Sequence, residues 1–150
     1  MEKITSFQAD HTKIVPGIYV SRVDGDVTTY DLRMKKPNGG DYLSDLQMHS
    51  LEHLLATFLR NGDKKENIIY VGPMGCRTGF YLLTRGLSDR QVLEELLIQL
   101  ENITSYDGEM PGASEYECGN YRELSLCEGK AAARDYLSVL KAYNGDFRYQ

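Results

Sequence analysis

The chain has 150 residues, 41% hydrophobic and 26% charged, which is typical of one globular domain burying about two-thirds of its unfolded surface. We therefore expect a single domain over residues 1–150. A formal net charge of −5 without a basic block argues against nucleic-acid binding. No apolar run reaches the about 18 residues that cross a bilayer, and no apolar signal segment is evident near Met1. Three cysteines, an odd number, favour reduced thiols and a cytoplasmic location.

The first half of the chain predicts a hairpin and then a helix. Residues 18–23 and 27–34 are rich in β-forming residues and flank Asp24-Gly25-Asp26, a hairpin signal. After a Gly- and Pro-containing loop, Ser44 and Gln47 form a capping box that opens a helix over about 45–60. Its predicted buried stripe has helical spacing and consists of Leu51, Leu54, Leu55, Phe58 and Leu59.

The second half predicts another pair of strands and two more helices. Residues 67–71 and 79–84 read as strands joined by a Gly-rich turn. A capping box from Ser88 to Gln91 opens a helix that runs to about Asn102, and residues 103–124 look irregular. Ser125 to Glu128 cap a last helix, which we expect to end near Asn144-Gly145. This order predicts an α+β fold with a mainly antiparallel sheet of about four strands packed against helices.

The first helix carries the run His49-Ser50-Leu51-Glu52-His53, an H-x-x-E-H motif. Two histidines four residues apart lie on one face of a helix, where their neutral imidazoles can share a divalent metal. A carboxylate beside them can move a proton at the metal-bound group. The motif predicts a metal site on this helix.

A catalytic metal site usually takes three protein ligands and keeps one position open, so a third ligand is needed. His11, the thiols and several carboxylates are candidates. Cys118 is followed by a glycine that frees the backbone for its thiolate to reach a metal. Cys76 lies in a Gly-rich turn beside Arg77, so it could be either reactive or structural. For Cys127, at the start of a helix, we expect a small buried hydrophobic residue.

These motifs together resemble a known family. The H-x-x-E-H helix, Gly72-Pro73-Met74-Gly75-Cys76-Arg77-Thr78-Gly79 and Cys118-Gly119-Asn120 are similar to S-ribosylhomocysteine lyase, the LuxS-type autoinducer-2 synthase. The segments Ser6 to His11 and Tyr30 to Arg33 extend the resemblance, which therefore spans about residues 6–122 in the family's order. The H-x-x-E-H motif alone is weak to moderate evidence, whereas the three motifs together are highly specific.

The resemblance implies the site and its assembly. It makes His49, His53 and Cys118 ligands of one divalent metal per subunit, Fe²⁺ in this family, with Zn²⁺ or Co²⁺ able to replace it. It makes Glu52 and Cys76 the general acid and base. Positions that bind the substrate are matched by Ser6, His11 and Arg33. The family works as a homodimer with active sites at the subunit interface.

The implied reaction cleaves S-ribosylhomocysteine to homocysteine and 4,5-dihydroxy-2,3-pentanedione, the autoinducer-2 precursor. The sugar carbonyl moves from C1 to C2 and then to C3 through enediolates, whose charge a Lewis-acid metal stabilises. Loss of the C4 proton then expels the thiolate by β-elimination. The chain has Tyr70 where the family pattern has an acidic residue, and Gly72 where a serine is common, so a substrate contact is expected to differ there.

Two other readings of the motif stay open. An inverzincin-type metallopeptidase would use Glu52 to activate a metal-bound water, with Glu115, Glu117 or Glu128 as third ligand. Its weakness is that the Cys76 turn would have no role. A non-catalytic protein would add Cys76 to the two histidines and Cys118, which gives a closed Cys₂His₂ site.

Overall fold

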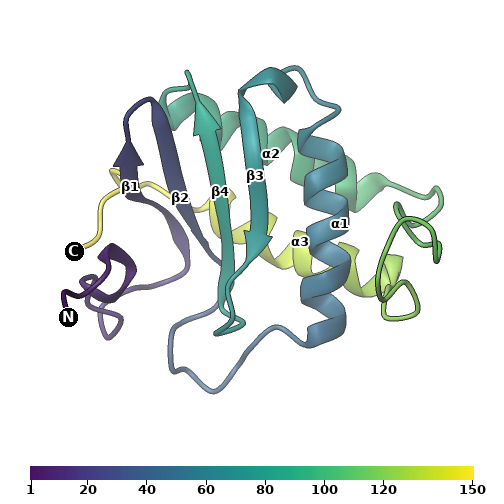
Figure 1. Cartoon of the computed structure of the whole chain (residues 1–150), viewed down its shortest axis with the longest axis horizontal. Coiled ribbons are helices and arrows are strands. Elements are labelled where there is room, and N and C mark those ends of the chain that lie inside the picture. The colour runs from purple at the N-terminus through teal and green to yellow at the C-terminus, as the bar shows by residue number, and fades with distance from the viewer.

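The computed structural model describes all 150 residues and has an α+β architecture (Figure 1). A four-stranded antiparallel sheet has the strand order β1-β2-β4-β3. The helices α2 and α3 lie behind it and α1 lies beside β3, while its front face carries none of these three α-helices (Figure 1). The strands are β1 (Gly17–Asp24), β2 (Val27–Arg33), β3 (Ile68–Pro73) and β4 (Gly79–Arg85). The helices are α1 (Asp45–Leu59), α2 (Asp89–Ser105) and α3 (Leu126–Lys141), with 3₁₀ turns at Thr5–Phe7 and Lys65–Asn67. The predicted fold class is confirmed.

The helix starts follow the predicted caps. The Ser44 hydroxyl accepts from the Gln47 N–H at 3.1 Å while the Gln47 side chain accepts from the Ser44 N–H, and Ser88 and Gln91 repeat this reciprocal pair. Such a cap is worth about 1 kcal/mol. Ser125 accepts from the Glu128 N–H at 3.2 Å and opens α3.

The largest errors in the predicted boundaries fall at helix C-termini. The second helix continues three residues beyond Asn102, because Ile103 still lies on its buried face and completes the apolar stripe. The third helix stops at Lys141 rather than near Asn144. From there the chain turns back, and the Tyr143 hydroxyl accepts from the Phe147 N–H.

The stripe predicted on the first helix forms the centre of the core. Its four leucines, Leu51, Leu54, Leu55 and Leu59, have no exposed surface. They join residues of the sheet in one apolar cluster, among them Tyr30, Leu32, Phe80 and Leu82. Burying each such side chain contributes about 1.5–3 kcal/mol. Phe58 is only half-buried, because it lies at the edge of the helix and packs edge-on against Tyr106. The buried stripe fixes the orientation of α1, and therefore of its two histidines.

Close packing of α1 against α3 places the loop between α2 and α3. A Cβ atom at Gly129 would lie 2.7 Å from Leu54 Cδ1, so only glycine permits this approach of the helices. The Ser50 hydroxyl accepts from the Ser125 N–H at 2.9 Å. The end of the loop is therefore held against the first turns of α1. None of the three helices combines the length and the apolar character needed to cross a bilayer.

Candidate metal centre

His49, His53 and Cys118 come together as the sequence predicts. Each offers one ligand atom, and these atoms lie within 4.8 Å of one another. Cys118 Sγ is 3.3 Å from His49 Nε2, and all three side chains are half-buried. The histidines come from the second and third turns of α1, whereas Cys118 comes from the irregular loop 69 residues after His49.

Backbone carbonyl groups set the tautomer of both histidines. His49 Nδ1 lies 2.8 Å from the Glu123 carbonyl oxygen, and His53 Nδ1 lies 2.9 Å from that of Pro111. A carbonyl can only accept, so each ring carries its proton on Nδ1. The lone pair of each Nε2 is then free for a metal, in the arrangement typical of metal-binding histidines. Both carbonyls belong to the loop that also supplies Cys118.

The donor set fits a borderline divalent ion. Two imidazole nitrogens and one thiolate suit Zn²⁺, Fe²⁺ or Co²⁺ rather than Mg²⁺ or Ca²⁺, which prefer oxygen ligands. The Asn120 N–H donates to Cys118 Sγ at 3.4 Å. With three protein ligands, a tetrahedral ion would keep one position for a substrate.

Glu52 lies on the same helix, one residue before His53. Its side chain is half-buried, and none of the six ion pairs of the chain includes it. Its carboxylate therefore has no cationic partner at ion-pair distance.

Cys76 lies in the turn between β3 and β4 and is exposed. Its Sγ is 3.0 Å from the Thr78 hydroxyl, which also accepts from Arg33 Nη1 at 2.8 Å. Arg33 is only 2% exposed and is paired with Asp31. The structure thus connects two predicted site residues, Arg33 and Cys76, through Thr78, whose role the sequence analysis missed. The P-M-G-C-R-T-G motif already contained this threonine.

Ser6 lines a cavity of about 460 Å³ that is bordered by the N-terminal segment and by residues of all four strands. Tyr70 and Gly72 line the same cavity, so both departures from the family pattern lie beside a predicted substrate residue. A side chain at Gly72 would overlap the Tyr70 ring, which makes the two residues a matched pair. His11 is half-buried, and its Nδ1 lies 2.9 Å from the Ala9 carbonyl oxygen.

A family model described as S-Ribosylhomocysteinase (LuxS) matches residues 4–145. The chain is 47% identical to the S-ribosylhomocysteine lyase of Finegoldia magna, over 93% of this chain and 92% of the relative. It is 46% identical to that of Borreliella burgdorferi strain ZS7, over 93% of each chain. The corresponding protein of Clostridium beijerinckii is 44% identical over 92% of this chain and 91% of its own length. The chain belongs to the S-ribosylhomocysteinase (LuxS) family.

Membership of the LuxS family agrees with the ligand group and leaves the two other readings without support in the geometry. No glutamate belongs to the ligand group, and the Glu117 carboxylate instead accepts from the Ser114 hydroxyl. Cys76 is also outside that group, so a closed Cys₂His₂ shell does not form within one chain. One expectation was wrong: Cys127 is exposed, because it lies on the face of α3 that points away from the core.

In this LuxS-family chain, the ligand group and the Cys76 turn are on different sides of α1. In the view of Figure 1 the β3–β4 turn lies to one side of the start of α1 and the loop after α2 to the other. The side-chain hydrogen bond of Cys76 goes to Thr78 and not to any of the three ligands. A single chain therefore does not bring all the predicted catalytic residues into contact.

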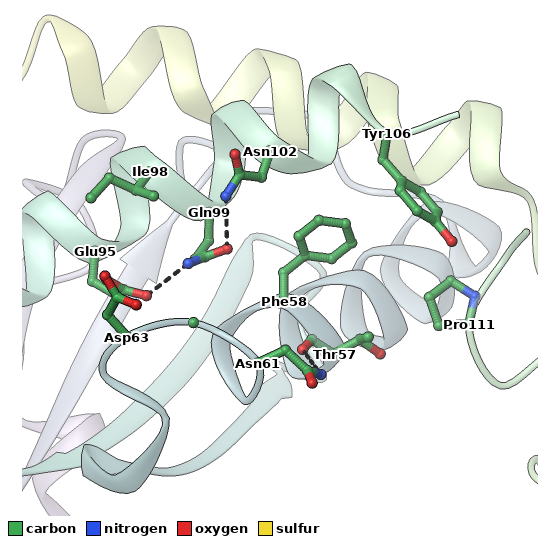
Figure 2. Close-up of a pocket in the computed structure, with 11 residues that line it drawn as sticks. Thr57, Phe58, Asn61, Asp63, Glu95, Ile98, Gln99, Asn102, Tyr106 and Pro111 are labelled. Atoms are coloured by element: carbon green, nitrogen blue, oxygen red, sulfur yellow. Dashed lines mark hydrogen bonds between the residues drawn. The ribbon is translucent and has the colours of Figure 1, made fainter. Parts of the chain in front are cut away.

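Another cavity, of about 490 Å³, lies between α1 and α2 and holds no predicted site residue (Figure 2). Its wall includes a ladder on α2 in which Asn102 donates to Gln99 and Gln99 donates to Glu95, at 3.2 and 2.8 Å (Figure 2). Pro111, whose carbonyl accepts from His53, stands at its rim beside Tyr106 (Figure 2). The cavity thus borders the loop that supplies Cys118, but it is not part of the metal centre.

Proposed function

We propose that this chain is a metal-dependent S-ribosylhomocysteine lyase, which forms homocysteine and 4,5-dihydroxy-2,3-pentanedione. The observation that carries the proposal is the His49, His53 and Cys118 group in a chain of the LuxS family. Relatives about 45% identical over most of the chain bear that enzyme name. The product is the precursor of autoinducer-2, so we propose a role in quorum sensing beside recycling of homocysteine.

We propose one divalent metal per subunit, Fe²⁺ natively, with Zn²⁺ or Co²⁺ as substitutes. His49 and His53 would hold it through Nε2, and Cys118 through its thiolate. The hydrogen bonds of the two Nδ1 atoms support this, because they leave both Nε2 atoms free, and the Asn120 N–H that donates to Cys118 Sγ fits a thiolate ligand. When bound, the ion supplies Lewis acidity to the oxygens of the substrate's sugar chain.

Glu52 and Cys76 are the groups that move protons. Each carbonyl migration removes a proton from the carbon next to the carbonyl and adds one to the former carbonyl carbon. The acid and base groups therefore end each migration in the protonation state in which they began it. In the last step a base takes the C4 proton, the C5–S bond breaks and homocysteine leaves as thiolate. The enol that remains becomes the diketone. We assign Cys76 to the migrations and Glu52 to the later steps.

Ser6, His11 and Arg33 are proposed to bind the substrate. The cavity beside Ser6 supports this for its hydroxyl. Arg33 has three of its N–H groups engaged by Asp31 and Thr78, so any substrate contact would use the N–H groups that remain.

We propose a homodimer whose active sites lie at the subunit interface. The separation of Cys76 from the ligand group within one chain supports it, since a partner could bring its own Cys76 to the metal. So do several exposed apolar side chains in the N-terminal segment and along the sheet: Ile4, Phe7, Val23 and Tyr70. The three free cysteines fit the reducing cytoplasm, where we place the enzyme.

A thiol-release assay tests the function. The protein is purified anaerobically with Fe²⁺ and given S-ribosylhomocysteine, and a chromogenic disulfide measures free homocysteine. Metal-replete protein should release one thiol per substrate, whereas metal-free protein should release none. If the metal-replete protein releases no homocysteine but cleaves peptides, the peptidase reading takes its place.

A further inference from the structure

A buried ion pair lies on the face of the sheet that none of the three α-helices covers. Tyr30 and Leu32 point from β2 into the core, so Asp31 and Arg33 point to the opposite face. They are nevertheless 0% and 2% exposed. Arg33 donates from Nε and Nη2 to the two carboxylate oxygens of Asp31, at 3.0 and 2.5 Å. Some other part of the chain must therefore keep water from this pair.

Part of that cover comes from the C-terminal segment, which returns along β1 (Figure 1). The Val20 N–H donates to the Phe147 carbonyl at 2.7 Å and holds the segment to the strand edge. The Tyr149 ring then stacks on Tyr19, with centroids 5.1 Å apart. Its hydroxyl donates to Asp31 Oδ2 at 2.7 Å. Burial raises the pKa of Tyr149, and the neighbouring Asp31 raises it further, so the hydroxyl keeps its proton for this bond.

The ion pair continues to Cys76. Arg33 Nη1 donates to the Thr78 hydroxyl, and because a guanidinium only donates, the hydroxyl proton is left for Cys76 Sγ, 3.0 Å away. Beside the larger effects of burial and of Asp31, a negative charge on Cys76 would raise the pKa of Arg33 and of Tyr81. Arg77 points elsewhere, with its guanidinium over the Tyr42 ring. Four consecutive hydrogen bonds thus join the chain terminus to the thiol.

We propose that Tyr149 is a positioning residue for Cys76, acting through Asp31, Arg33 and Thr78. This proposal rests on the proposed function in one respect only, which is that Cys76 has a reactive role. The Tyr149 hydroxyl fixes the Asp31 carboxylate, the carboxylate fixes the guanidinium, and the guanidinium orients the Thr78 hydroxyl toward sulfur. The family match ends at residue 145, so this support lies in a segment outside it.

The test measures the reactivity of the thiol without any turnover. Tyr149→Phe removes the hydroxyl and keeps the stacked ring, and iodoacetamide alkylation of Cys76 is followed by peptide mass spectrometry from pH 6 to pH 10. At pH 7 the alkylation rate should fall about fivefold, as expected for one lost hydrogen bond, and approach that of the wild type at high pH. The exposed Cys127 is an internal control whose rate should not change.

Two further variants separate positioning from a merely structural role. Tyr19→Phe also removes a hydroxyl, but one that donates to the Val15 carbonyl, so the Cys76 profile should stay that of the wild type. Thr78→Val should slow alkylation at pH 7 at least as much, and adding Tyr149→Phe to it should have no further effect. A Tyr149→Phe protein with a lower melting temperature and an unchanged Cys76 profile would overturn the proposal. Because alkylation needs no substrate, a failed lyase assay would leave this result intact.

Discussion

A Cβ atom at Gly112 would lie 2.7 Å from Nδ1 of His53. Gly112 also has φ +68°, a conformation that side chains disfavour, and it follows the residue whose carbonyl accepts the His53 proton. The orientation of one ligand ring therefore depends on the missing side chain of a loop residue 59 positions along the chain.

Gly112→Ala should weaken metal binding, because the added methyl group displaces His53 from the Pro111 carbonyl. Loss of such a supporting contact typically costs about 10–100-fold in affinity. Competition with a chromogenic chelator measures the change. Gly25→Ala is the matched control, because Gly25 also has a positive φ (+62°) and a Cβ there meets nothing within 4 Å. Equal affinities of the two variants would contradict the role of Gly112.

Cys118→Ala should remove the sulfur ligand. The Co²⁺-loaded wild type should show a thiolate-to-metal charge-transfer band in the near ultraviolet, and the variant should lack it. The metal should also raise the melting temperature of the variant less, because a weaker ligand stabilises the folded state less. Cys127→Ala, at an exposed cysteine, should behave like the wild type. A charge-transfer band that persists in Cys118→Ala would exclude this cysteine as the ligand.

Glu52→Gln should retain its metal and lose about 10²–10⁴-fold in turnover, because an amide cannot exchange protons. Metal analysis and the thiol-release assay are run on the same sample. Glu94→Gln, at an exposed position on α2, is the control and should keep wild-type turnover. Turnover of Glu52→Gln within a few-fold of the control would remove Glu52 from the reaction.

Mixed dimers test whether each site is shared. Cys76→Ala and His53→Ala chains should each be inactive alone. If the metal of one chain works with Cys76 of the other, each mixed dimer has one intact site, and random mixing restores about a quarter of the wild-type activity. If both residues acted within one chain, mixing would restore nothing.

The folded chain should lose stability at alkaline pH. Burial raises the pKa of Tyr30, Tyr136 and Tyr149 above the ordinary value of 10.0, with Asp89 adding to the shift at Tyr30 and Asp31 at the other two. Above about pH 10 the unfolded chain therefore binds fewer protons than the folded chain, and the free energy of unfolding falls as pH rises. Urea unfolding at pH 9 and at pH 11 measures this. Tyr149→Phe should show a shallower fall, and an equal free energy at both pH values would contradict the prediction.

Local patterns predicted most of the fold, because they report short-range physics. The caps at Ser44 and Ser88 satisfy N–H groups within the same turn, and the stripe from Leu51 to Leu59 follows helical periodicity. The helix ends near Asn102 and Asn144 were predicted less well, because distant packing at Ile103 and Phe147 decides them.

The sequence by itself determined the α+β class, the helix that carries His49, Glu52 and His53, and, through its motifs, the family. Only the tertiary structure decided how the site is supported. The carbonyls of Pro111 and Glu123 and the thiol of Cys118 come from a loop without periodic pattern, so their approach to α1 depends on the path of the chain. The contact of Tyr149 with Asp31 spans 118 residues and also arises only from folding. Side-chain spacing specifies a helix face, whereas contacts between distant segments depend on packing of the whole chain.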